Sequence, residues 1–297
     1  MSANALSREK SSTLNAEILP FVKAEDAGGL TPVKDDNEEK GKKIKFKACS
    51  DDCIMLKEKD MEKPVYKRVL IKISGEALAG DKKTGFDFDF IAKVCRTVKE
   101  CTEKGVEVGI VVGGGNFWRG VKDGAGHIER VSADRMGMLA TAMNCLAVCD
   151  VFRQTGTPAR VMTAVDIQGV GERYSTDKAK KCLGNGEVVL FGCGTGSPFF
   201  STDTAAVLRA AEIGADAILL AKNIDGVYTA DPRVDASAVK FDEISYDEVL
   251  ARHLAVMDSA ATSLAMDNNI PVVVFALKEP ENILKVIAGE KTGTLVK

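Results

Sequence analysis

Three consecutive glycines and an asparagine, Gly113 to Asn116, form the stretch of this sequence best suited to chemistry. They follow the apolar run 106–112, which predicts a buried strand. Each glycine costs roughly 0.5–1 kcal/mol in regular structure relative to alanine, so a chain that keeps three needs either positive φ or a close backbone approach to another group. An anion is the simplest such group, because the N–H groups of a strand-to-helix turn converge on one point and Arg119 adds a bidentate phosphate donor. The alternative is a tight surface turn that binds nothing.

Three more segments, at or just after the ends of predicted strands, carry polar and small residues suited to a ligand. They are Lys72-Ile73-Ser74-Gly75, residues 194–203 with the sequence GTGSPFFSTD, and residues 225–232 with the sequence DGVYTADP. In an open α/β sheet, ligands bind beyond the carboxyl ends of the strands, so these loops are the candidate site. Lys72 interrupts an otherwise apolar strand and is either a charge that faces a ligand or a salt-bridged lysine whose stem packs on the sheet.

The chain alternates short apolar segments with longer amphipathic ones. Strands are predicted at 69–73, 106–112, 159–162, 188–191, 217–220, 272–275 and near Leu295, and helices at 90–104, 132–155, 175–183, 202–213, 258–267 and 281–287. Asp87 or Asp89 is expected to cap the first helix, and Ser245 with Glu248 forms a capping box. Strands that are apolar throughout and alternate with helices indicate a sheet covered on both faces. The predicted fold class is α/β, a three-layer αβα sandwich with a mainly parallel central sheet.

Composition limits the partners. The chain has 297 residues, 28% of them charged, and a net charge of -3, which gives no electrostatic footprint for nucleic acid. No apolar run approaches the roughly 20 residues of a membrane helix, the longest being 270–277. We therefore expect no nucleic acid and no membrane as partner.

The first 64 residues differ in composition from the rest. They are rich in charges of both signs and poor in apolar anchors, so residues 1–64 are expected to be a flexible extension or one that docks on the body. A transit peptide is an alternative, but such peptides are poor in acidic residues. The folded domain is expected at 65–297.

Cysteines and histidines argue against disulfides and structural zinc. The N-terminus has no apolar signal segment, and most of the eight cysteines lie in apolar periodic stretches, which favours reduced core thiols and a cytoplasmic protein. Cys49 and Cys53 are four apart, and only His127 and His253 could complete a zinc site.

The chain lacks the sequence motifs of several enzyme classes. No GxxxxGK[ST] is present, GxGxxG is missing after the first strand, and there is no GxSxG. P-loop enzymes, dinucleotide enzymes and serine hydrolases therefore have little support.

The strand lysine followed by Ser-Gly, the GGGN loop, GTGxPFFxTD and DGVYTADP, in this order and spacing, resemble the amino acid kinase superfamily, and within it the bacterial UMP kinases. Asp134 with Met-Gly-Met at 136–138 is typical of that branch, and the match runs from about Pro64 to the C-terminus. The resemblance implies the amino acid kinase fold and phosphoryl transfer from ATP, with Mg²⁺, to UMP in pyrimidine nucleotide biosynthesis. It also implies a homohexamer that GTP activates and UTP inhibits.

The resemblance also assigns site residues. Those implied in catalysis are Lys72, Arg119, Asp203 and Asp258. Those implied in ATP binding are Lys72, Ile73, Ser74, Gly75, Gly115, Arg119, Lys222, Tyr228 and Asp231. Those implied in UMP binding are Gly114, Asp134, Thr195, Gly196, Ser197, Pro198, Phe199, Phe200, Ser201 and Thr202. No residue is assigned as a metal ligand. Three roles stay open for Asp203 and Asp258: they orient Lys72, they contact the metal, or they only cap their helices. Ser197 stands where many relatives carry Asn.

These residues suit phosphoryl transfer. A phosphate monoester has a second pKa of about 6, so UMP is largely a dianion near neutral pH and needs no general base. The protein must supply positioning and positive charge, which Lys72 and Arg119 can provide. Two alternatives remain: a superfamily kinase for a carboxylate or carbamate, which would lack Asp134, and a non-catalytic nucleotide sensor or storage protein.

Overall fold

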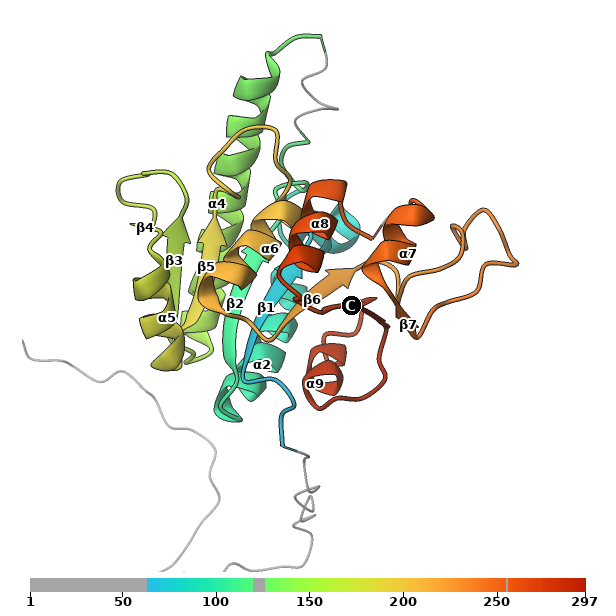
Figure 1. Ribbon diagram of the computed structural model, residues 1–297. Helices are drawn as coiled ribbons and strands as arrows, with labels where there is room; N and C mark the ends of the chain where they lie inside the picture. Colours follow the sequence, from blue (N-terminus) through green and yellow to red (C-terminus); the bar gives the residue numbers. More distant parts are fainter. Residues whose placement is uncertain (1–62, 120–125, 255) are drawn as a thin grey trace, which may run out of the picture. The chain divides into compact units, whose positions relative to one another are not determined.

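A computed structural model of the chain describes residues 63–119, 126–254 and 256–297 (Figure 1). The predicted extension, residues 1–64, lies outside this part except for its last two residues, so the domain boundary stays a prediction. The described residues all belong to one compact unit, Lys57–Lys297.

Within these ranges the strands form one sheet, in the order β4-β3-β5-β2-β1-β6-β8-β9-β7. The strands are β1 (Arg68–Ile73), β2 (Glu107–Val112), β3 (Ala159–Thr163), β4 (Glu172–Arg173), β5 (Val188–Gly192), β6 (Ala217–Lys222), β7 (Glu243–Ile244), β8 (Val272–Ala276) and β9 (Thr294–Val296). Neighbouring strands are parallel except for β8 and β9, which are antiparallel. The prediction of a mainly parallel sheet is confirmed, and β1 lies in its middle, between β2 and β6.

Helices cover both faces of this sheet (Figure 1). They are α1 (Gly75–Ala79), a 3₁₀ turn (Gly80–Lys82), α2 (Phe88–Glu103), α4 (Arg130–Gln154), α5 (Thr176–Gly184), α6 (Thr202–Ile213), α7 (Tyr246–Ala251), α8 (Ser259–Asp267) and α9 (Asn282–Ile287). Helices α2, α4 and α9 share one hydrophobic core with the sheet, and α5, α6, α7 and α8 share the other. The predicted three-layer αβα arrangement is therefore confirmed.

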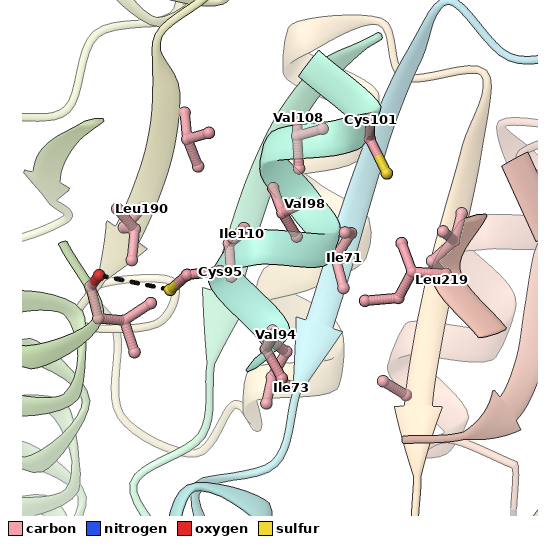
Figure 2. Close-up of a cluster of buried hydrophobic side chains, with 14 of the residues drawn as sticks. Ile71, Ile73, Val94, Cys95, Val98, Cys101, Val108, Ile110, Leu190 and Leu219 are labelled. Atoms are coloured by element: carbon pink, nitrogen blue, oxygen red, sulfur yellow. Dashed lines mark hydrogen bonds between the residues drawn. The ribbon is translucent and has the colours of Figure 1, made fainter. Parts of the chain in front are cut away.

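The alternation of side chains along β1 explains why there are two cores. Val69, Ile71 and Ile73 point into the core under α2, whereas Leu70 points into the core under α6. Figure 2 shows Val98 of α2 lying over the strand side chains of the first core. Burying one such side chain contributes roughly 1.5–3 kcal/mol, so a strand with apolar residues on both sides needs a helical layer on each face.

Helix α4 is long and apolar enough, by length and composition alone, to cross a membrane. Half of that stretch is buried in this fold, where α4 packs against β3, β5 and α2. A core helix of a globular domain meets the same criterion, and packing against the sheet accounts for the buried half of α4.

The predicted elements are present, with ends shifted by a few residues. Asp87, one of the two cap candidates, accepts a hydrogen bond from the Phe90 N–H and caps α2, and Ser245 caps α7 through the Glu248 N–H. The short elements α1, β4 and β7 are not predicted from the sequence, because they are too short to show a period. Strand β6 continues to Lys222, two residues beyond its predicted end at Leu220.

Candidate active site

Lys72 stands near the carboxyl end of β1 and is almost fully buried. Its Nζ atom lies 2.6 Å from Oδ1 of Asp203, in the first turn of α6. Apart from this ion pair, that oxygen has no hydrogen-bond partner among the described residues. A buried lysine needs a paired charge, so Asp203 holds the ammonium group at the end of the strand.

Asp258 occupies a different position. It caps α8 by accepting from the Ala261 N–H at 2.9 Å, and it accepts from the hydroxyls of Ser201 and Thr204 at the start of α6. Of the roles left open for these two carboxylates, Asp203 contacts Lys72, whereas Asp258 caps α8 and joins its N-terminus to that of α6.

The glycines at 113–115 are predicted to be needed either for positive φ or for close backbone approach, and the structure distinguishes the two. None of Gly113, Gly114 and Gly115 has positive φ, so the requirement is close approach. A Cβ at Gly114 would come within 3.0 Å of α4, at Ala140 Cβ and the Gly137 carbonyl. Likewise, a Cβ at Gly75 would lie 2.5 Å from the Gly113 carbonyl oxygen. The glycines thus let the loops after β1 and β2 pack on each other and on α4.

Two buried asparagines fix this loop. Asn116 and Asn144 exchange hydrogen bonds of 3.0 and 2.8 Å, each amide donating to the oxygen of the other. The Asn144 amide also donates to the Gly113 carbonyl at 2.6 Å, and the Asn116 amide donates to the Gly85 carbonyl at 2.9 Å. Both side chains are at most 1% exposed, so every polar group of the pair is satisfied inside the protein.

Arg119 follows the glycine run and is half-exposed. Its guanidinium lies 2.7 Å from Glu76 Oε1 in α1, and its Nε donates to the Gly115 carbonyl. These contacts keep the guanidinium beside the glycine loop, which is predicted to bind a phosphate.

A cavity of about 700 Å³ lies beside Lys72 at the ends of β1 and β6. Such a volume is within the range of small-molecule and cofactor sites. Of the residues predicted for ATP, those that line it are Lys72, Ser74, Lys222, Tyr228 and Asp231. Of the same set, those that do not line it are Ile73, Gly75, Gly115 and Arg119. The Ile73 side chain is buried in the core, so a ligand could meet only its backbone.

The same cavity is lined by side chains that the sequence reading did not select. Among them are Glu76, Asn223, Arg233, Arg252 and His253. Arg252 and His253 follow α7 and come from no recognised motif. Their place on the cavity depends on how α7 packs, so no local pattern points to them.

Two charged side chains of this cavity, Lys222 and Asp231, have pKa values shifted by their surroundings. Burial lowers the pKa of Lys222, Asp203 opposes the shift and Lys72 adds to it, and the Lys222 Nζ donates to the Val256 carbonyl. The Arg233 guanidinium lowers the pKa of Asp231 to about 2. The cavity thus presents cations near Lys72 and a carboxylate that stays ionised at its outer end.

The loop from β5 to α6 contains most of the residues predicted for UMP. Its backbone has positive φ at Cys193, Gly194, Gly196 and Phe199. Thr141 of α4 accepts from the Cys193 N–H at 2.8 Å and so ties the start of the loop to the helix. The predicted UMP residues of this loop are Thr195, Gly196, Ser197, Pro198, Phe199, Phe200, Ser201 and Thr202.

Asp134 reaches the same loop from α4. It accepts from the Phe199 N–H at 2.8 Å and from Arg130 Nε at 2.9 and 2.8 Å. A Cβ at Gly113 would lie 3.6 Å from Thr202 Oγ1, so the glycine loop adjoins the other end of this segment. The structure therefore brings Gly114, Asp134 and the loop with the other predicted UMP residues together beside α4.

A family model described as the amino acid kinase family matches residues 67–276. The chain belongs to the amino acid kinase family. This confirms the resemblance of the lysine, GGGN, GTGxPFFxTD and DGVYTADP segments to the members of that family. Those four segments all lie within the matched residues.

Three solved structures of UMP or uridylate kinases are similar to this chain. The chain is 40% identical to the UMP kinase from Bacillus anthracis, with a TM-score of 0.76, over 78% of this chain and 96% of that one. It is 35% identical to the UMP kinase from Ureaplasma parvum, with a TM-score of 0.74, over 78% and 98%. The uridylate kinase from Archaeoglobus fulgidus is 27% identical, with a TM-score of 0.61, over 77% and 99%.

Proposed function

We propose that this protein is a UMP kinase, which transfers the γ-phosphoryl group of ATP to UMP and yields ADP and UDP in pyrimidine nucleotide biosynthesis. One observation carries the proposal: a buried cation, Lys72, stands between a nucleotide-sized cavity and the loop that meets Asp134. The similarity to the Bacillus anthracis UMP kinase over nearly its whole length agrees with this assignment.

The residues divide the work of phosphoryl transfer. ATP occupies the cavity lined by Ser74, Lys222, Tyr228 and Asp231, and UMP lies under the loop between β5 and α6. Lys72 then faces the transferring group and offsets the charge that develops on its oxygens. Asp203 holds Lys72 in that position, so the cation is placed before the substrates arrive.

Arg119 and the glycine loop hold phosphate. When a phosphate binds, the Arg119 guanidinium leaves its ion pair with Glu76. It then donates two parallel hydrogen bonds to two phosphate oxygens. Gly114 and Gly115 contribute backbone N–H groups from the turn that follows β2. The acceptor oxygen belongs to a phosphate that is already ionised, so no side chain removes a proton.

Mg²⁺ is the cofactor that accompanies ATP. Within the described ranges there is no group of three or more His, Cys, Asp or Glu side chains that could hold a metal ion. Magnesium at such sites is bound by phosphate oxygens together with one or two carboxylates. This fits the residues present, since Asp203 and Asp258 are the carboxylates at the N-termini of α6 and α8. The ion would supply charge neutralisation on the ATP phosphates.

We further propose that the protein is a homohexamer, activated by GTP and inhibited by UTP. Four apolar side chains, Met136, Leu139, Met143 and Leu146, lie on one face of α4 and are 39–53% exposed. Their spacing places them on a single stripe, and a second copy of the chain is the occupant that we propose for it. Leu139→Glu should then dissociate the assembly in sedimentation velocity, with Lys93→Glu on α2 as the exposed control.

The cytoplasm is the proposed location. The six cysteines of the described part are buried and unpaired in disulfides, which is the state typical of a reducing compartment.

A coupled assay of ADP release tests the activity. We expect ADP release with UMP and none with aspartate, N-acetylglutamate or carbamate. Turnover of a carboxylate or carbamate instead of UMP would make the protein another kinase of the family. ATP binding by calorimetry without ADP release from any acceptor would make it a nucleotide sensor.

A further inference from the structure

The first turns of α4 carry a contact that none of the assigned roles explains. Arg130 Nε donates to both carboxylate oxygens of Asp134, at 2.9 and 2.8 Å. The same guanidinium lies 5.3 Å from the centre of the Phe199 ring, within the roughly 6 Å range of a cation–π contact. The Phe199 N–H closes the triangle by donating to Asp134 at 2.8 Å.

Phe199 is an unusual residue for the tip of a loop. Its φ is +72°, a region that few residues other than glycine adopt, and its side chain is 65% exposed. Burial therefore does not hold this conformation. Among the described residues, the Asp134 carboxylate contacts its backbone N–H and the Arg130 guanidinium contacts its ring.

Asp134 retains room for a ligand within this contact. A carboxylate has about four acceptor positions, and here the Arg130 Nε is shared between both oxygens while the Phe199 N–H takes one position on Oδ2. The outer position of Oδ1 can therefore accept from a ribose hydroxyl while both contacts persist. The Asp134 side chain as a whole is 15% exposed, and the Arg130 side chain is 46% exposed.

We propose that Arg130 is a positioning residue for the acceptor nucleotide. It orients the Asp134 carboxylate toward the ribose hydroxyls and, through Phe199, holds the loop between β5 and α6 beside it. The inference rests on the proposed function, because it assumes that UMP binds at Asp134. Arg130 does not line the cavity proposed for ATP, so we expect its effect to be confined to the acceptor side.

The test compares steady-state kinetics of Arg130→Ala and Arg130→Lys with Arg135→Ala, a matched exposed arginine on the same helix. We expect Arg130→Ala to raise KM for UMP by roughly tenfold, with KM for ATP and kcat within about twofold of wild type. Arg130→Lys should fall between, because lysine keeps the charge but lacks the planar fork and stacking surface. Arg135→Ala should match the wild type.

A second readout addresses the orientation of Asp134. The preference for UMP over dUMP, as a ratio of kcat/KM values, should fall by roughly fivefold in Arg130→Ala and stay constant in Arg135→Ala. Phe199→Ala, which keeps the backbone N–H, should raise KM for UMP less than Arg130→Ala does.

Two outcomes overturn the inference. One is that Arg130→Ala and Arg135→Ala have the same KM for UMP and the same UMP-to-dUMP ratio. The other is that Arg130→Ala lowers the melting temperature and affects UMP and ATP equally, which would make the contact structural. If Arg130→Ala does not fold, the KM values and the UMP-to-dUMP ratios of Arg130→Lys and Phe199→Ala test the same inference. Failure of the proposed function is distinct, since the wild-type protein would then not phosphorylate UMP.

Discussion

Lys72 Nζ lies 2.6 Å from Asp203 Oδ1, and this ion pair joins the central strand β1 to the first turn of α6. It places one buried positive charge between the cavity at the end of β6 and the loop from β5 to α6. The Phe199 N–H of that loop donates to Asp134 of α4. The position of the charge follows from the parallel register of β1 and β6, which aligns Lys72 with Leu220 and brings Lys222 beyond it.

Replacing Lys72 by methionine should lower kcat by a factor on the order of 10²–10⁴ while nucleotide affinity changes less, because the charge acts on the transition state more than on the bound ground state. Steady-state kinetics and calorimetry of ATP binding measure the two effects separately. A Lys72→Met variant with near wild-type kcat would remove Lys72 from the mechanism.

Asp134→Ala should raise KM for UMP by roughly tenfold or more and leave KM for ATP nearly unchanged, since the carboxylate is proposed to accept from the UMP ribose. The measurement is initial rate against each substrate at saturating levels of the other. Equal effects on both substrates would mean that Asp134 only supports its helix and loop.

Asn144→Ala should disturb the glycine loop through the Asn116–Asn144 pair. Because a displacement of about 1 Å can cost on the order of 10²-fold in rate, kcat/KM should fall by roughly tenfold to a hundredfold. Asn282→Ala is the matched control: it also removes a buried amide, which donates to the Ala276 carbonyl at 3.1 Å, but on α9.

Both asparagine variants should have lower melting temperatures, and only Asn144→Ala should lose activity per folded molecule. If the two variants lose the same small amount of activity, the asparagine pair is a stability element and the loop keeps its shape without it.

Native thiols should react slowly. Burial raises the pKa of Cys95 and Cys101 to about 12, so at pH 8 the thiolate fraction is on the order of 10⁻⁴. In a Cys49→Ser/Cys53→Ser variant, DTNB should label almost none of the six remaining cysteines in the native protein and all six in denaturant. Rapid native labelling of one cysteine would identify a local opening that exposes it.

Deleting residues 2–62 should leave an active kinase whose melting temperature changes only slightly, because this charged sequence has few apolar anchors with which to bury surface. The deletion keeps Pro64 to Val69, so that β1 retains its entry. Sedimentation, a thermal scan and kinetics decide together. Loss of the oligomer would make the segment structural, and an altered response to UTP or GTP would make it regulatory.

The sequence by itself determined the fold class, the family and the order of the loops at the site. Strands such as β1, which are apolar on both sides, require helices on both faces of the sheet. This requirement can be recognised from the sequence of the strand alone. Lys72 lies near the carboxyl end of β1, and the segments Gly113 to Asn116, 194–203 and 225–232 each follow a strand. A parallel sheet must therefore bring all four to the same edge.

Only the tertiary structure decided which side chains meet there. Close approach and not positive φ explains Gly114, because α4 lies against it, and nothing within the glycine run itself records the path of α4. Asp203 and Asp258 both stand at helix N-termini in the sequence, yet one pairs with Lys72 and the other ties α8 to α6. Such contacts join residues far apart in the chain, and they depend on how helices pack against the sheet, which local periodicity does not specify.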